Sequence, residues 1–147
     1  MEKRDTRFRR AFWRYYALLY PNTPKAQEFL GTPGFGGHTL VYRVEGWGGK
    51  LSVKQWLGSE TVGTDIRGRK GVDVAELMDP YREQFDQEFA DDYKTDRCPW
   101  GSLLPWYVTY CRPEGGTRNC DRWDEMAKWL EERRQMYETI LARGRVH

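Results

Sequence analysis

Residues 34–57 read GFGGHTLVYRVEGWGGKLSVKQWL, which is two alternating apolar runs joined by a glycine-rich turn. Alternation with a period of two is typical of β-strands, so this stretch predicts an antiparallel hairpin. The residues expected to face the core are Leu40, Tyr42, Val44, Leu51, Val53, Gln55 and Leu57. A two-stranded ribbon is only marginally stable alone, so the rest of the chain must supply elements that pack on it.

The opposite face of this hairpin is polar and aromatic, and it places Arg43, Lys54 and Trp56 together. Trp47 lies at the top of the turn, where we expect an exposed anchor. Residues 59–71 follow without any periodicity and are interrupted by glycines, which predicts a mobile, exposed loop. The cations of that loop are Arg67, Arg69 and Lys70.

Helical periodicity flanks the hairpin on both sides. Residues 6–20 place apolar side chains on one helical face, and residues 24–30 predict a second, short helix. After the basic loop, Asp73 is expected to cap a further helix, which Pro80 either kinks or restarts.

The last third of the chain predicts one more strand, at residues 103–111, and a long C-terminal helix capped by Asp121. The solvated side of that helix is expected to carry Glu131, Glu132, Arg133 and Arg134. The order is therefore helix-helix-strand-strand-helix-strand(-strand)-helix. That order predicts an α+β fold in which helices pack over one face of a small, mainly antiparallel sheet.

Length and composition favour one globular domain, residues 1–147, in a reducing cytoplasm. The net charge is only +2, which excludes an acidic DNA mimic that works by bulk charge. Three cysteines at irregular spacing argue against a disulfide framework, and no run of about 18 apolar residues predicts a membrane span. The aromatic content of 15% suits core, stacking or self-association surfaces, so a homo-oligomer stays open.

Several stretches together resemble an uncharacterised bacterial and archaeal domain that often follows a predicted restriction-type nuclease module. They are Phe12-Trp13, KLSVKQWL at 50–57, ELMDPYREQFDQEF at 76–89, VTYCRPEGG at 108–116 and RWDEMAKWLEERRQMYETIL at 122–141. The resemblance covers about residues 10–141, but this chain adds a basic loop after the second strand and carries no nuclease module. It implies an accessory role near restriction or phage-defence systems, and it carries over no catalytic residue.

Two metal-dependent chemistries fail on spacing. A restriction-type nuclease needs an acidic residue two positions before a strand lysine, where this chain has Ser52 before Lys54. Zinc ligands normally come in closely spaced pairs, and Cys98, Cys111 and Cys120 are too far apart. We therefore expect no metal, no cofactor and no catalytic residue.

Other enzymatic functions remain open, although no motif in the sequence supports them. His38 follows a glycine pair at a strand start, where it could touch a ligand or pair with Cys111 or Cys120. Asp65 and Asp73 flank the basic loop and are the acids best placed to join a cleft there.

The sequence favours a non-enzymatic binding module, an accessory or inhibitory protein in conflict between phage and bacterium. Its partner would be a protein of a nuclease or defence complex, or a nucleic acid. Guanidinium groups bind phosphate and indoles stack on bases, which assigns contact to the basic and aromatic residues around the hairpin. These are Arg43, Trp47, Lys54, Trp56, Arg67, Arg69, Lys70 and His38. The alternative is a nucleotide or small-molecule binder in which the basic loop closes over residues 34–38.

Overall fold

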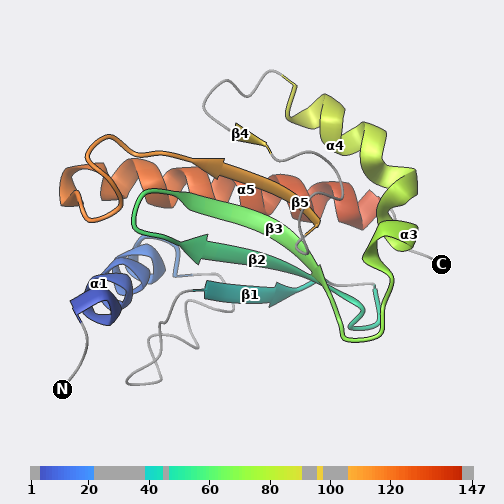
Figure 1. The fold of residues 1–147 in the computed structure, drawn as a ribbon, viewed down its shortest axis with the longest axis horizontal. Helices are drawn as coiled ribbons and strands as arrows, with labels where there is room; N and C mark the ends of the chain where they lie inside the picture. The colour runs from blue at the N-terminus through green and yellow to red at the C-terminus, as the bar shows by residue number, and fades with distance from the viewer. Residues whose placement is uncertain (1–3, 22–38, 45–46, 91–95, 98–105, 144–147) are drawn as a thin grey trace.

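The structure is a computed structural model that describes residues 4–21, 39–44, 47–90, 96–97 and 106–143. Its centre is a five-stranded sheet with the order β1-β2-β3-β5-β4, in which every neighbouring pair is antiparallel (Figure 1). The strands are β1 (Thr39–Arg43), β2 (Leu51–Leu57), β3 (Val62–Gly68), β4 (Asp96–Arg97) and β5 (Trp106–Cys111). The helices are α1 (Arg4–Leu19), α3 (Val74–Met78), α4 (Arg82–Glu88) and α5 (Trp123–Arg143).

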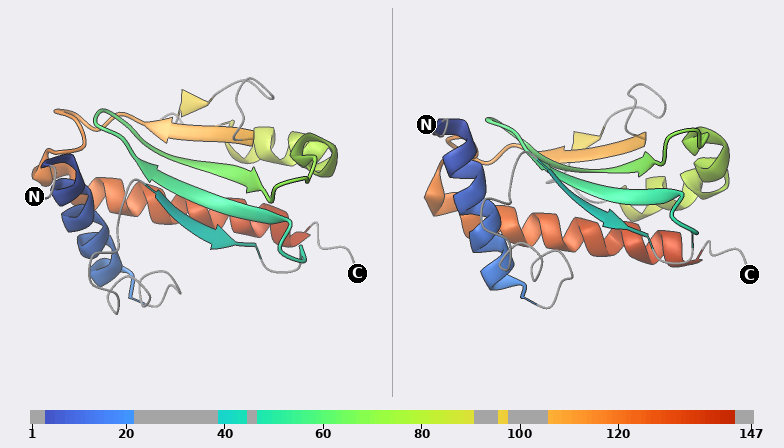
Figure 2. Two further views of the ribbon diagram at one scale, coloured as in Figure 1. Left: turned by 60° about the horizontal axis from the view of Figure 1, so that its bottom comes forward. Right: turned by 90° about the horizontal axis from the view of Figure 1, so that it is seen from below.

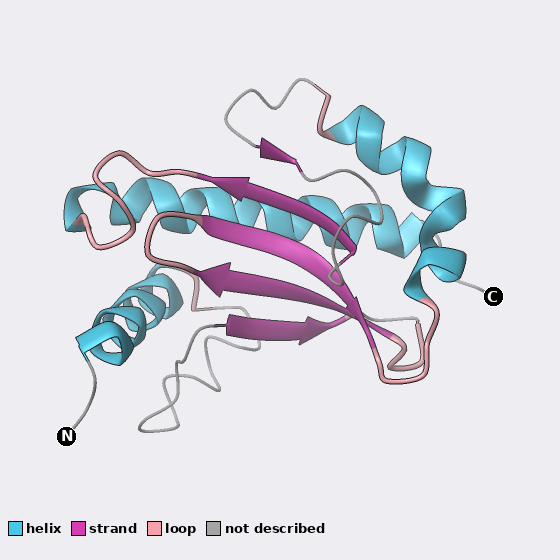
Figure 3. Ribbon diagram, viewed as in Figure 1, coloured by secondary structure: helices cyan, strands magenta, loops and turns pink. Residues whose placement is uncertain are grey.

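Helices and sheet form two layers, which confirms the α+β class (Figure 3). Helix α5 runs along the sheet, α1 packs across it near one end, and α4 packs beside it near the other. Seen from the side, the described helices gather on one face of the sheet (Figure 2). The opposite face of β1, β2 and β3 therefore carries no described helix.

The predicted hairpin is confirmed, and its register pairs Tyr42 with Val53 and Val41 with Lys54. Directly opposed residues of an antiparallel pair point to the same face, so Lys54 lies on the face turned away from the helices. Burial alternates strictly along β2, with Leu51 and Val53 fully buried against the helix layer.

The prediction of a mobile loop at residues 59–71 is wrong, because its middle forms the central strand β3. Val62, Thr64 and Ile66 alternate toward the helix layer and are all fully buried. The glycines that suggested a loop are a packing requirement: Gly63 leaves room for a neighbouring indole, and Gly68 leaves room for Val74. The glycines and charged residues of this segment therefore predicted a loop where the chain forms an ordinary strand, β3.

The predicted solvated side of α5 is also wrong, since Glu131, Arg133 and Arg134 are each less than 10% exposed. Only Glu132 of that group is exposed. The cause is a buried polar network that reaches across the core. Tyr16 donates to Glu131 Oε2 at 2.7 Å and accepts from Gln55 Nε2 at 3.0 Å, while Arg134 pairs with Glu131 and Glu138.

The helix boundaries partly match their predicted signals. Asp73 caps α3 as expected, accepting a hydrogen bond from the backbone of Glu76 at 3.2 Å. Pro80 interrupts the helix, since it is the second residue of a 3-10 turn, Asp79–Tyr81, that lies between α3 and α4. The cap before α5 is Asn119 rather than Asp121, at the start of a 3-10 turn that leads into the helix. The predicted helix at 24–30 lies outside the described residues.

Candidate binding face of the sheet

The register of the three antiparallel strands builds ordered rows on the face without described helices. Ser52 of β2 lies between Arg43 of β1 and Arg67 of β3, which makes a basic row near the β1–β2 turn. The next row pairs Lys54 with Asp65. Strand geometry then places the row of Trp56 about 13 Å from the row of Arg67.

The third row is aromatic and has a glycine at its centre. Gly63 of β3 lies opposite Trp56 on one side and opposite Tyr110 of β5 on the other. A β-carbon at position 63 would lie 2.1 Å from two atoms of the Trp56 indole, so the ring occupies that space. Both aromatic side chains are half-buried, which leaves part of each ring open to a ligand.

The middle row contains a buried acid between two cations. Asp65 is 1% exposed. Its Oδ1 lies 3.7 Å from Arg67 Nε, so the two groups form an ion pair, but this distance is too long for a hydrogen bond. Burial raises the pKa of Asp65 to about 6, against the opposing effect of the Lys54 and Arg67 charges. Burial also lowers the pKa of Lys54, and the charge of Asp65 offsets part of that effect.

Further cations gather where the β1–β2 turn meets the turn after β3. The backbone N–H of Arg69 donates to Lys50 O at 2.9 Å, and the Arg69 guanidinium lies beside Gly49. Lys50, Arg69 and Lys70 are exposed, and the side chain of Arg67 is 46% exposed. This end of the sheet therefore presents a cluster of cations to solvent.

Most of the predicted site residues lie close together on this face, but two predictions about them are wrong. Trp47 is not an exposed anchor: it is 7% exposed, its Nε1 donates to Leu141 O at 3.0 Å, and its ring packs edge-on against Tyr81. Arg67 reaches the face as part of β3 rather than from a loop. His38 and the side chain of Arg43 lie outside the described residues, although the β1 register puts Arg43 on this face.

Sequence reasoning missed Lys50 and Tyr110 as members of this face, and it considered Asp65 only as a cleft acid. A signal for the place of Asp65 was available in Val62-Gly63-Thr64-Asp65-Ile66, where β-branched residues alternate with the rest. Reading that run as a strand would have paired Asp65 with Lys54. The face would then have appeared as three rows across adjacent strands.

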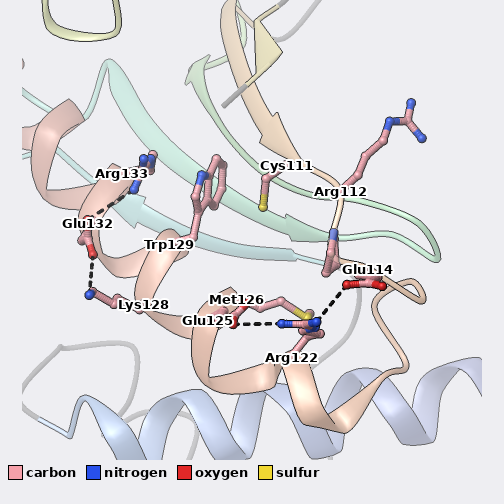
Figure 4. Close-up of a pocket in the computed structure, with 11 residues that line it drawn as sticks. Cys111, Arg112, Glu114, Arg122, Glu125, Met126, Lys128, Trp129, Glu132 and Arg133 are labelled. Atoms are coloured by element: carbon pink, nitrogen blue, oxygen red, sulfur yellow. Dashed lines mark hydrogen bonds and ion pairs between the residues drawn. The ribbon is translucent and has the colours of Figure 1, made fainter. Parts of the chain in front are cut away.

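A second candidate site is a groove of about 600 Å³ between α5 and the end of β5. Trp129 and Cys111 face each other across it, with Met126 below (Figure 4). Its charges are largely paired with one another, as Arg122 bridges Glu114 and Glu125 at 2.8 and 3.1 Å. Arg112 points away from these residues (Figure 4). The groove therefore offers a ligand fewer available cations than the sheet face does.

Within the described part of the chain, no three His, Cys, Asp or Glu residues are grouped so that they could hold a metal ion. Cys120 is exposed in the turn before α5, and Cys111 is half-buried on the groove wall. No helix among the described residues is both long enough and apolar enough to cross a bilayer.

Compared with protein-family models, curated proteins and solved structures, the chain matches none. The resemblance to the nuclease-associated domain therefore stays a prediction.

Proposed function

We propose that this chain is a non-enzymatic binding module whose sheet face turned away from the described helices binds a single strand of nucleic acid. The observation that supports this best is the arrangement of rows on one face. Cations lie at the turn end, around Arg67, and aromatic rings lie about 13 Å away, around Gly63. Single-strand binding combines a cationic track for the backbone with rings on which bases stack.

The charge balance supports attraction that is local rather than global. The cations of the face are Lys50, Lys54, Arg67, Arg69 and Lys70. Against these five, the described residues of the three rows supply two carboxylates, Asp65 and Asp96. The whole chain carries only +2, so neutral and acidic surfaces elsewhere would not hold a strand. Binding should therefore depend on salt and be confined to this face.

In biological terms, we propose that this module is an accessory or inhibitory component of conflict between phage and bacterium. That context is what the resemblance to the nuclease-associated domain implies. A module that covers a single strand could shield it from a nuclease or recruit one to it. An acidic surface of a defence protein offers similar charge, and it is the outcome to consider if no nucleic acid binds.

The direct test is anisotropy of a fluorescein-labelled oligothymidylate of about 12 nucleotides, titrated at several salt concentrations. We expect Arg67→Gln with Arg69→Gln to weaken binding and to reduce the slope of log K against log salt by about one to two. Arg7→Gln with Arg14→Gln is the matched control, because it removes two exposed cations from α1 in the helix layer. Equal losses in the two double variants would rule out the sheet face as the binding surface.

The groove beside α5 favours a second candidate, which is binding of a small molecule. Its volume of about 600 Å³ lies within the range of small-ligand sites, and Trp129 and Met126 give it an apolar lining. A ligand there should protect the thiol of Cys111 from alkylation. Cys111 protection by a mixture of nucleotides, without an effect on oligonucleotide binding, would favour this candidate.

A further inference from the structure

We infer that Asp65 restrains the sheet face by partly neutralising Lys54 and Arg67, so that nucleic-acid binding strengthens as the solution is acidified. This inference rests on the proposed function and names the residue that regulates the same site. Asp65 would act through its two neighbours, because a side chain that is 1% exposed cannot itself reach a bound strand. It is therefore a positioning residue and has no direct contact with the ligand.

The geometry gives Asp65 two cationic neighbours on its own face. Lys54 lies directly opposite on β2, where paired side chains are roughly 4.5–5.5 Å apart at the β-carbon. Arg67 lies two residues along β3, and its Nε is 3.7 Å from Asp65 Oδ1. Among the described residues, no group hydrogen-bonds to the buried Oδ1 atom, so the two cations are its main electrostatic support there.

The other titratable and charged groups near Asp65 leave this pairing dominant. From α5, Tyr137 interacts electrostatically with Asp65. Burial raises the pKa of Tyr137 well above its ordinary value, so this side chain stays neutral. From β5, Tyr110 lies in the next row, opposite Gly63. From β1, Arg43 lies one row away by register, opposite Ser52. From β4, Asp96 lies opposite Tyr110 in the aromatic row, so Asp65 is the described acid that shares a row with Lys54.

Protonation of Asp65 changes what a phosphate meets on this face. With Asp65 ionised, the group formed by Lys54, Asp65 and Arg67 carries a net charge of one. With Asp65 protonated, the same group carries a net charge of two positive units, and Arg67 loses the attraction of the carboxylate. Because burial raises the pKa of this carboxyl to about 6, the change falls between neutral and mildly acidic solution. An unrestrained cation is free to pair with one more phosphate.

The test compares the pH dependence of oligothymidylate binding in three proteins. Wild type should bind more tightly at about pH 5 than at about pH 7, by up to roughly tenfold for one added phosphate contact. Asp65→Asn should bind at neutral pH about as tightly as wild type does in acid, and its affinity should not vary over this range. Glu60→Gln is the control, since it removes an exposed carboxylate from the turn between β2 and β3 and should keep the wild-type profile.

The outcomes separate the inference from the proposed function. If Asp65→Asn keeps the wild-type pH profile, or binds more weakly at every pH, the restraint by Asp65 is overturned while strand binding stands. If no protein binds at any pH, the proposed function fails and the inference falls with it. Circular dichroism and melting curves at each pH establish that every variant is folded, and Asp65→Ser replaces Asp65→Asn if the latter is not.

Discussion

The indole of Trp56 on β2 occupies the space over Gly63 on β3, where a β-carbon would lie 2.1 Å from two ring atoms. A separation this short is not tolerated between non-bonded carbons, so a side chain at position 63 and the present position of Trp56 exclude each other. Glycine weakens a strand interior, because it loses more conformational freedom on folding than any other residue. Its place in a central strand is explained by this close approach.

Gly63→Ala should therefore both destabilise the protein and displace Trp56 from the aromatic row. We expect a loss of roughly 1–3 kcal/mol in the free energy of unfolding, as for other overpacked sites, together with weaker oligothymidylate binding. Urea unfolding and anisotropy measure the two effects. Glu60→Ala, at an exposed position of the turn between β2 and β3, is the control and should change neither by much. An unaltered melting temperature and affinity in Gly63→Ala would contradict the close approach.

Trp47 and Trp56 should separate stability from binding. Trp47 is 7% exposed and its Nε1 donates to Leu141 O, so Trp47→Ala should cost roughly 3–5 kcal/mol of unfolding free energy. Under conditions where that variant is folded, its affinity for the oligonucleotide should be unchanged. Trp56→Ala should cost less stability, because Trp56 is half-buried, but should weaken binding by roughly 1–3 kcal/mol per stacked base.

The same two substitutions can also contradict the proposed contact surface. If Trp56→Ala binds normally, the aromatic row does not contact the strand. If instead Trp47→Ala binds weakly while fully folded, the hairpin turn is the contact surface after all. Both variants need unfolding curves in the same buffer as the binding titrations.

The buried pair of Glu131 and Arg134 should show strong coupling in a double-mutant cycle. Glu131→Gln leaves Arg134 largely buried with Glu138 as its remaining carboxylate, and such one-sided losses cost about 3–5 kcal/mol. Combining Glu131→Gln with Arg134→Met removes both charges, so it should be less destabilising than the sum of the single variants. Additive costs, measured by urea unfolding, would indicate that the two side chains do not depend on each other.

Asp65 should make folding stability depend on pH in a predictable direction. Burial raises its pKa from 3.8 to about 6 on folding. Below pH 3.8 the carboxyl is protonated in both states and has no effect. As pH rises toward 6 the unfolded chain releases its proton first, so folding is progressively disfavoured, and the loss is complete above pH 6. A difference of this size corresponds to roughly 3 kcal/mol.

The measurement is the difference in unfolding free energy between wild type and Asp65→Asn across this range. Relative to the variant, wild type should lose stability as pH rises from about 4 to about 7, by up to roughly 3 kcal/mol. Other titrating groups are common to both proteins and cancel in the comparison. A difference that stays constant with pH would show that Asp65 does not titrate abnormally in the folded protein.

The helices and the hairpin were readable from sequence because their signals are local. Alternation from Leu40 to Leu57 predicted both strands and the face that carries Lys54 and Trp56, and Asp73 predicted the start of α3. The cap before α5 was misplaced by two residues, from Asn119 to Asp121, because both side chains suit that role. An element whose signal lies within a few residues can be predicted without knowing what packs around it.

Burial of polar residues depended on contacts between distant parts of the chain. Periodicity placed Glu131 and Arg134 on a solvated face, but α1 brings Tyr16 to Glu131 across 115 residues. Trp47 was expected to project from a turn, yet it is covered from 94 residues away by the end of α5. Neither partner can be inferred from local sequence, because each depends on how α1 and α5 cross the sheet.

The sequence by itself determined the α+β class, the hairpin with the two faces of its strands, and the presence of basic and aromatic residues around it. Only the tertiary structure decided that residues 62–68 form the central strand. That strand assembles the proposed binding face, because it sets Asp65 beside Lys54 and Gly63 beneath Trp56. The physical reason is that cross-strand neighbours are defined by pairing between strands, which a pattern of glycine and charge along one segment does not reveal.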